Sequence, residues 1–336
     1  MSSEPTWDGP TSVTSPDELL GFKVGMDRRL ADWPQVVEYL RLLSDQSDRV
    51  LTRELGKTTD GNPFLLTCIS SPGNIRDLDR YRDIQCQLSD PRKIPESREA
   101  LLISEARAVV AITCSIHATE VGGTQMALEL AHQLATRADP EVERILDNVI
   151  LLLVPSLNPD GLISVKRWYD STLDTHYEGA TPPFLYHRYA GHDNNRDFYM
   201  SALAETTNIN RVLFHEWFPQ IVYNHHQTGP SGTVLYAPPF RDPPNHNLDP
   251  LILTGLDAIG AAMHGRFVSE GKGGATMRSG GSYSTWWNGG LRTTPYFKNM
   301  IGLLTETIGN PTPIQIPFRP ERQLPRGDLP LPVEPG

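Results

Sequence analysis

The stretch Ser115-Ile116-His117-Ala118-Thr119-Glu120-Val121-Gly122-Gly123 decides the fold of this chain. A short apolar, β-branched run over residues 108–114 precedes it, and a segment rich in Ala, Leu, Gln and Glu over 124–137 follows it. This order predicts a buried strand, a tight junction and a helix. Because ligands of open α/β sheets bind at the carboxyl ends of the strands, we expect His117 and Glu120 to be two of three zinc ligands.

A second continuous apolar run, over residues 148–155, predicts another buried strand that a helix separates from the first. Two such strands joined by a helix form a β-α-β unit. Further strands are expected over residues 49–56, 64–70, 220–223 and 300–306, the first two forming a hairpin around the turn residues 59–63. The sequence therefore predicts an α/β fold, a single domain with a mixed, largely parallel twisted sheet flanked by helices on both faces.

Apolar residues at helical spacing predict further helices over residues 27–43, 78–88, 207–217 and 248–269. Two long loops are expected, a polar one over 162–200 and a glycine-dense one over 271–290. Long irregular loops inside a compact domain are usually functional or disordered. Residues 1–20 are expected to form a flexible N-terminal arm, residues 21–311 the folded domain, and the proline-rich residues 312–336 a tail or linker.

Composition excludes several classes of protein. The net charge of -10 disfavours a nucleic acid or an anionic membrane as partner. We find no apolar run near the roughly 18 residues that a membrane helix needs, and the N-terminus lacks the features of a secretory signal. Three scattered cysteines are too few for a disulfide framework. These observations together indicate a cytoplasmic protein.

Polar groups follow four of the expected strands: His117 and Glu120, Asn158 and Asp160, His225 and His226, and Glu306. If the strands lie side by side, these groups meet at one edge of the sheet. Two histidines and one glutamate form a catalytic zinc set that leaves a fourth position for water, and zinc lowers the pKa of that water toward about 7. A carboxylate that does not bind the metal is then needed to take the proton of the water, and Glu306 is the candidate.

Each of these residues also has a structural interpretation. Glu120 can be a carboxylate favoured by the helix dipole in a first turn, and a lone His117 is more often structural than a ligand. His225 and His226 can be one buried and one exposed histidine, and Glu306 can end its strand in solvent. The order of these groups along the chain, rather than any single residue, favours a metal site over the structural interpretations.

That order resembles the zinc carboxypeptidase family, the carboxypeptidase A-like metallopeptidases. The family pattern is His-x-x-Glu after a strand, Asn-Pro-Asp-Gly, Asp-x-Asn-Arg, a third histidine after a strand, Ser-Gly-Gly-Ser, and a glutamate at the end of a late strand. The matching blocks here are His117 to Glu120, Asn158 to Gly161, Asp193 to Arg196, His226, Ser279 to Ser282, and Thr305-Glu306. The resemblance covers about residues 25 to 310.

For the metal, the resemblance implies that His117, Glu120 and His226 bind one zinc ion. The family's third histidine lies two residues after an acidic or amide position, which selects His226 after Asn224 and leaves His225 as the alternative. Asp193 is implied to orient His117.

For the reaction, the resemblance implies that Glu306 is the general base and then the general acid. Asn195 and Arg196 are implied to hold the terminal carboxylate of a peptide, which suits the planar fork of arginine. Arg167, after Asn-Pro-Asp-Gly, is the candidate for stabilising the oxyanion, although its spacing from that turn is shorter than usual. Tyr283 falls where the family sets side-chain preference, and it is neither the small apolar nor the acidic residue expected there.

The sequence departs from the family at one more position, because Thr276 stands where a mobile tyrosine is often found; Tyr283 and Tyr296 are the nearby substitutes. The leading expectation is a zinc metallocarboxypeptidase acting on a peptide or small amide with a free C-terminal carboxylate. The alternatives are a related zinc amidase or deacylase for acylated amino acids or cell-wall peptides, and a catalytically silent binding module on the same fold.

Overall fold

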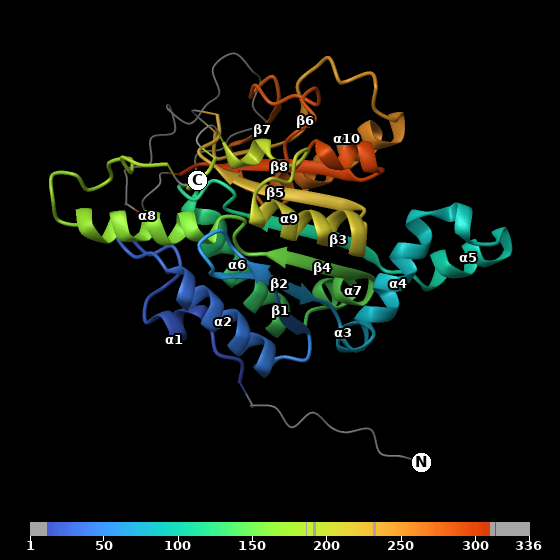
Figure 1. Cartoon of the computed structure of the whole chain (residues 1–336), viewed down its shortest axis with the longest axis horizontal. Helices are drawn as coiled ribbons and strands as arrows, with labels where there is room; N and C mark the ends of the chain where they lie inside the picture. Colours follow the sequence, from blue (N-terminus) through green and yellow to red (C-terminus); the bar gives the residue numbers. More distant parts are fainter. Residues whose placement is uncertain (1–11, 186, 191–192, 231–232, 310–312, 314–336) are drawn as a thin grey trace.

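Eight strands form one sheet in the order β1-β2-β4-β3-β5-β8-β6-β7, with helices on both faces (Figure 1). The computed structural model of the chain describes residues 12–185, 187–190, 193–230, 233–309 and 313. The strands span Val50–Lys57 (β1), Pro63–Ile69 (β2), Ala108–Cys114 (β3), Val149–Val154 (β4), Ile221–Gln227 (β5), Leu235–Phe240 (β6), Ala275–Arg278 (β7) and Ile301–Thr307 (β8). The central strands β4, β3, β5 and β8 run parallel, whereas β1, β2 and the contact of β6 with β8 are antiparallel. The predicted fold class, including the hairpin, is confirmed.

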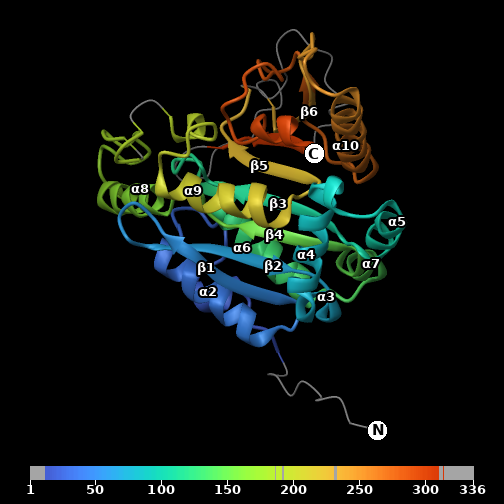
Figure 2. The ribbon, with the colours of Figure 1, turned by 45° about the vertical axis from the view of Figure 1, so that its right-hand side comes forward.

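The described helices precede β1 or connect later strands of the sheet. They span Pro16–Leu20 (α1), Trp33–Gln46 (α2), Pro72–Arg76 (α3), Leu78–Ser89 (α4), Glu96–Glu105 (α5), Val121–Thr136 (α6), Pro140–Asn148 (α7), Pro159–Thr172 (α8), Ala204–Arg211 (α9) and Pro250–Ser269 (α10). Short 3-10 turns occur at Pro91–Lys93, Asn194–Arg196 and Thr294–Lys298, and Val212–Trp217 is a π-helix. Figure 2 shows α4 and α9 in front of the sheet and α2 at its lower edge.

Strand β4 is buried on both of its faces, which explains why its sequence is a continuous apolar run. Ile150 and Leu152 face a core built with α4, α5 and α9, whereas Leu151 and Leu153 face a second core built with α2, α6 and α7. Side chains alternate across a strand, so a strand covered on both faces must be apolar at every position. Burying both faces leaves only the strand ends for polar chemistry.

Three expectations for the connecting segments were wrong. The segment 162–200 is not loop throughout, because Asn158 accepts a hydrogen bond from the backbone of Gly161 and so caps α8, which runs to Thr172. The glycine-dense segment contains β7, and β6 was missed because Pro238 and Pro239 lie within it and proline weakens a strand signal. Part of the expected N-terminal arm is the helix α1, whose Leu20 is buried. The expected tail, apart from Pro313, lies outside the described residues.

Within the described part of the chain, α10 alone is long and apolar enough to cross a membrane by length and composition. An 18-residue window of this helix has a mean hydropathy of 1.2, although Asp257 and Arg266 interrupt its apolar sequence. Ile252 and Leu256 of α10 are buried against β6 and β8. This face of the helix therefore belongs to the third apolar core of the domain.

Candidate metal centre and active site

Three potential metal ligands converge at the carboxyl end of the parallel strands. One ligand atom from each of His117, Glu120 and His226 lies within 4.8 Å of the other two. His117 Nδ1 is 2.7 Å from one carboxylate oxygen of Glu120, and His226 Nδ1 is 2.9 Å from the other. Two imidazole nitrogens and a carboxylate oxygen are a donor set that zinc prefers, and three protein ligands leave a position for water.

The junction after β3 brings His117 next to Glu120. Ser115 adopts a left-handed backbone conformation with φ of 46°, and its hydroxyl donates to the carbonyl of Glu120 at 2.9 Å while accepting from the backbone of Thr124. The backbone N–H of Glu120 donates to the carbonyl of His117 at 2.9 Å. These bonds close a tight turn, and Glu120 occupies the position just before α6.

The Nε2 atom of each histidine contacts a further side chain, which belongs to a distant segment for His117 and to the same strand for His226. His117 Nε2 is 2.9 Å from Asp193, whose same oxygen accepts from the backbone of Asn195. His226 Nε2 is 2.6 Å from the side-chain amide of Asn224. Such outer contacts fix the orientation of a ligating imidazole. They leave the Nδ1 atoms of both histidines directed at Glu120.

Neighbouring histidines favour the ionised form of the Glu120 and Asp193 carboxyl groups. Burial works to raise the pKa of Glu120, but the charge of His226 and the hydrogen bond from His117 hold it at about 2. Burial likewise opposes ionisation of Asp193, and the hydrogen bond from His117 lowers its pKa to about 2. The pKa of His117 is raised to about 10 because its bonds to Asp193 and Glu120 outweigh burial. Two ionised carboxylates around these imidazoles suit a bound cation.

Glu306 lies beside this cluster, and its pKa is raised whereas that of Glu120 is lowered. It is buried near the end of β8 and is the register partner of His226 on β5. Burial raises its pKa to about 7, while the charge of His226 and the nearby hydroxyl of Tyr283 act to lower it. Gly229 makes room for it, because a Cβ there would lie 2.4 Å from the Cβ of Glu306. A carboxylate with a pKa near neutrality can both accept and return a proton.

Asn195 and Arg196 border the cluster on a 3-10 turn. Asn195 Nδ2 is 3.5 Å from His226 Nε2. The guanidinium of Arg196 lies 3.3 Å from Asp193 and 4.9 Å from the ring centre of Trp287. A hollow of about 370 Å³ adjoins them, and its lining consists of Asn195, Arg196, Ser284, Trp287, Gly290, Arg292 and Thr293.

His225 and Arg167 do not join the cluster. Asn158 and Asp160 do not join it either, because Asn158 caps α8 and Asp160 binds the β1–β2 turn. His225 faces away from His226, as alternate residues of a strand must, and its Nδ1 lies 2.7 Å from the hydroxyl of Tyr223. Its pKa is lowered to about 4, chiefly by burial. Arg167 is exposed on α8 and makes no contact with the cluster among the described residues. His225 is therefore not the third metal-ligand candidate. The oxyanion role of Arg167 stays a prediction without geometric support.

Two residues that contribute to the site were not predicted from the sequence. The backbone N–H of Gln227 donates to Glu120 at 3.2 Å, which nothing in the side-chain pattern indicates. Arg292 lines the hollow, but it lies in a segment without any motif. Tyr283 was expected only as one of two possible substitutes for the tyrosine missing at Thr276, and its proximity to Glu306 was not predicted. Tyr296, the other candidate, is buried within the third core.

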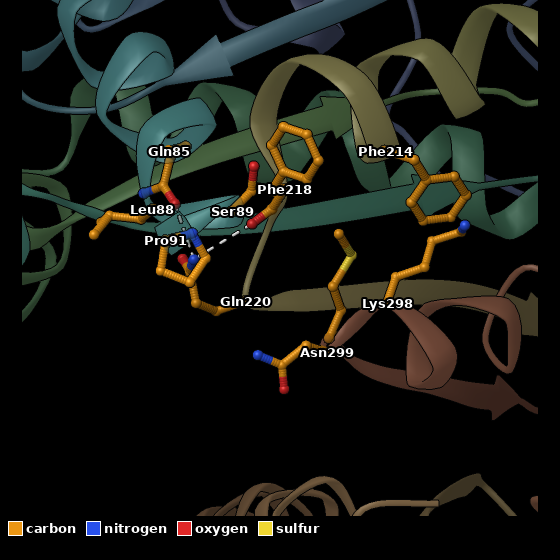
Figure 3. Close-up of a pocket in the computed structure, with 10 residues that line it drawn as sticks. Gln85, Leu88, Ser89, Pro91, Phe214, Phe218, Gln220, Lys298 and Asn299 are labelled. Atoms are coloured by element: carbon orange, nitrogen blue, oxygen red, sulfur yellow. Dashed lines mark hydrogen bonds between the residues drawn. The ribbon is translucent and has the colours of Figure 1, made fainter. Parts of the chain in front are cut away.

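Another hollow, of about 520 Å³, lies at the opposite end of the sheet (Figure 3). Gln220 and Met300, which precede β5 and β8, line it together with Phe214 and Phe218. Its lining contains one charged residue, Lys298, and no histidine or carboxylate. This hollow therefore offers no imidazole or carboxylate that could bind a metal or accept a proton.

Comparisons with known proteins agree with this geometry. The sequence profile of the zinc carboxypeptidase family matches residues 36–299, which include the three clustered residues but end before Glu306. Human carboxypeptidase D is 28% identical over 150 residues, covering 42% of this chain and 10% of that protein, so the chain aligns with about a tenth of its length.

Solved structures show the same fold. A metallo-carboxypeptidase from Burkholderia cenocepacia matches with a TM-score of 0.54 and 14% identity over 83% of this chain and 60% of its own. Carboxypeptidase A from Helicoverpa armigera matches with a TM-score of 0.53 and 14% identity over 87% of this chain and 70% of its own.

Proposed function

The chain belongs to the zinc carboxypeptidase family, and we propose on that premise that it is a zinc-dependent metallocarboxypeptidase that hydrolyses the C-terminal peptide bond of its substrate. One observation carries the proposal. Three ligand atoms from His117, Glu120 and His226 converge within 4.8 Å, and a buried carboxylate that is not among them, Glu306, lies on the neighbouring strand.

His117, Glu120 and His226 would hold one zinc ion through Nδ1, a carboxylate oxygen and Nδ1, with Asp193 fixing the ring of His117. A bound zinc ion polarises a carbonyl and lowers the pKa of a water to about 7. The convergence of these three groups supports the assignment, because imidazole nitrogen and carboxylate oxygen are ligand atoms that zinc prefers.

Glu306 would move the protons. Its carboxylate takes the proton of the attacking water and passes it to the amine that leaves when the peptide bond breaks. A pKa of about 7 allows both transfers near neutral pH. The hydroxyl of Tyr283, which lies close enough to Glu306 to influence its pKa, would contact the substrate at the same bond.

Asn195 and Arg196 would position the substrate. The guanidinium of Arg196 is exposed at the edge of the hollow, where its N–H donors can bind the two oxygens of a terminal carboxylate. A substrate anchored in this way presents its last peptide bond to Glu306 and the metal ligands. Asn195, which also contacts His226, links the anchor to the metal cluster.

The test is hydrolysis of matched peptides that end in a free carboxylate or in an amide, with zinc-loaded protein and with chelator-treated protein. We expect zinc-loaded protein to release the last residue of the free peptide only, and chelation to abolish release. Equal cleavage of amidated peptides or of acylated amino acids would instead support a zinc amidase or deacylase. Absence of both bound metal and hydrolysis would support a silent binding module.

A further inference from the structure

We propose that the hollow beside the metal cluster accepts a C-terminal residue with an acidic side chain, and that Arg292 binds this side chain. The inference rests on the proposed carboxypeptidase function, because it takes Arg196 as the anchor of the α-carboxylate. A C-terminal glutamate or aspartate has two carboxylates, and two arginines from different segments of the chain, Arg196 and Arg292, line the hollow.

Arg292 lacks an acidic partner, unlike Arg196. Its Nη1 donates to the carbonyl of Ser284 at 2.7 Å, and its guanidinium lies 4.5 Å from the ring centre of Phe240. No carboxylate forms an ion pair with it in the described ranges, whereas Arg196 lies 3.3 Å from Asp193. The bond to Ser284 uses one of the five N–H donors of the side chain. Arg292, a half-buried arginine without an ion-pair partner among the described residues, therefore lines the hollow.

The rest of the lining favours an anion of side-chain size. Ser284, Thr293 and Gly290 are small and uncharged, and Trp287 supplies an apolar wall. A basic side chain would meet two positive charges in this hollow, and an apolar side chain would leave the donors of Arg292 without a partner. Removing such donors from water without a hydrogen bond is costly, so both alternatives are disfavoured relative to an acidic side chain.

Arg292 also has a structural task, and the chain offers a matched control for it. Arg241 Nε donates to the carbonyl of Ser282 at 3.0 Å, while Arg292 donates to the carbonyl of Ser284. The two arginines thus anchor the same loop on either side of Tyr283, but only Arg292 lines the hollow. Arg241→Gln tests loss of loop anchoring, and Arg292→Gln tests the same loss together with loss of the charge in the hollow.

The experiment measures kcat/KM of zinc-loaded protein for acylated dipeptides that differ only in a C-terminal Glu, Gln, Leu or Lys. We expect Glu to be preferred over the isosteric Gln by about 10- to 100-fold, as for a hydrogen bond to a charged group. Arg292→Gln is expected to remove this preference and Arg292→Lys to restore part of it. Arg241→Gln is expected to keep the wild-type ratio of Glu to Gln.

Preference for Leu or Lys, or an equal Glu to Gln ratio in wild type and Arg292→Gln, would overturn the inference while leaving the carboxypeptidase function intact. A second measurement does not depend on hydrolysis. L-glutamate is expected to raise the Tm of the wild-type protein more than L-glutamine at the same concentration, and Arg292→Gln to abolish the difference. Equal shifts for the two amino acids would refute the inference, whereas a protein that binds glutamate but releases no C-terminal residue would refute only the proposed reaction.

Discussion

His226 on β5 and Glu306 on β8 are register partners on adjacent parallel strands, so their side chains share one face of the sheet. The preceding pair, His225 and Thr305, faces the opposite side, where the Thr305 hydroxyl lies 3.4 Å from His225 Nδ1. This register selects His226 as the metal-ligand candidate and places it beside the proposed base. The sheet thereby brings two functions together from segments that are far apart in the chain.

Asp193→Asn is expected to weaken zinc binding by about 10- to 100-fold, as is typical when the carboxylate behind a ligating histidine is altered. The reason is the 2.9 Å contact of Asp193 with His117 Nε2, which the neutral amide supports less well. Competition with a chelating dye measures the affinity. Asp170→Asn, exposed on α8 and paired with Lys166, is the control, and an unchanged affinity in Asp193→Asn would argue against the orienting role.

Arg196→Gln is expected to lower kcat/KM for peptides with a free C-terminus by about 10- to 100-fold, because it removes a charged hydrogen-bond donor to the carboxylate. The preference for free over amidated peptides should fall with it. Arg211→Gln, at an exposed arginine that ends α9 and pairs with Glu216, is the matched control. Retention of the full preference in Arg196→Gln would show that another group anchors the carboxylate.

Asp160→Ala is expected to lower the free energy of unfolding by about 2–4 kcal/mol, since buried hydrogen-bond donors would lose their acceptor. Asp160, in the first turn of α8, accepts from the Thr58 hydroxyl at 2.6 Å, the Asp60 backbone at 2.7 Å and the Asn62 side chain at 2.7 Å. It thereby fixes the β1–β2 turn to the helix. Urea unfolding measures the effect against Asp257→Ala, an exposed change that should cost at most about 0.5 kcal/mol. A loss of similar size in both variants would contradict this account.

Glu205 is expected to contribute to the loss of stability in acid. Burial opposes its ionisation, but the hydrogen bonds from His187 and from the backbone of Thr59 lower its pKa. Because its folded-state pKa lies below the unfolded value of about 4.3, the stabilisation is present above that pH and is lost as pH falls through the folded-state pKa. Urea unfolding between about pH 6 and 3 should therefore show a shallower pH dependence for Glu205→Gln than for wild type. Parallel curves would contradict the assignment.

Much of the sheet could be predicted from the sequence because its central strands are buried on both faces. The runs 108–114 and 148–155 correspond to β3 and β4, and the polar residues at their ends lie at the edge where the cluster forms. The start of α8 could not be predicted in this way, because Asn158-Pro159-Asp160-Gly161 is equally typical of a turn and of a capped helix start.

The hollow could not be predicted from the sequence for a different reason. Its lining comes from the 3-10 turn at Asn195 and from loop residues between Ser284 and Thr293. Loop conformation is set by tertiary contacts, such as the backbone N–H of Leu291 donating to the side chain of Asn195 at 2.9 Å. No local sequence pattern indicates such a contact, so the sequence alone could not identify Arg292 as a residue that lines the hollow.

The most direct test of the central claim is hydrolysis by Glu306→Gln at known zinc content. The amide keeps the shape of the side chain but cannot accept a proton, and Glu306 is not one of the clustered ligand residues. We predict wild-type zinc content with hydrolysis of a free-carboxylate peptide reduced by about 10²- to 10⁴-fold. Hydrolysis at the wild-type rate with zinc bound would contradict the mechanism.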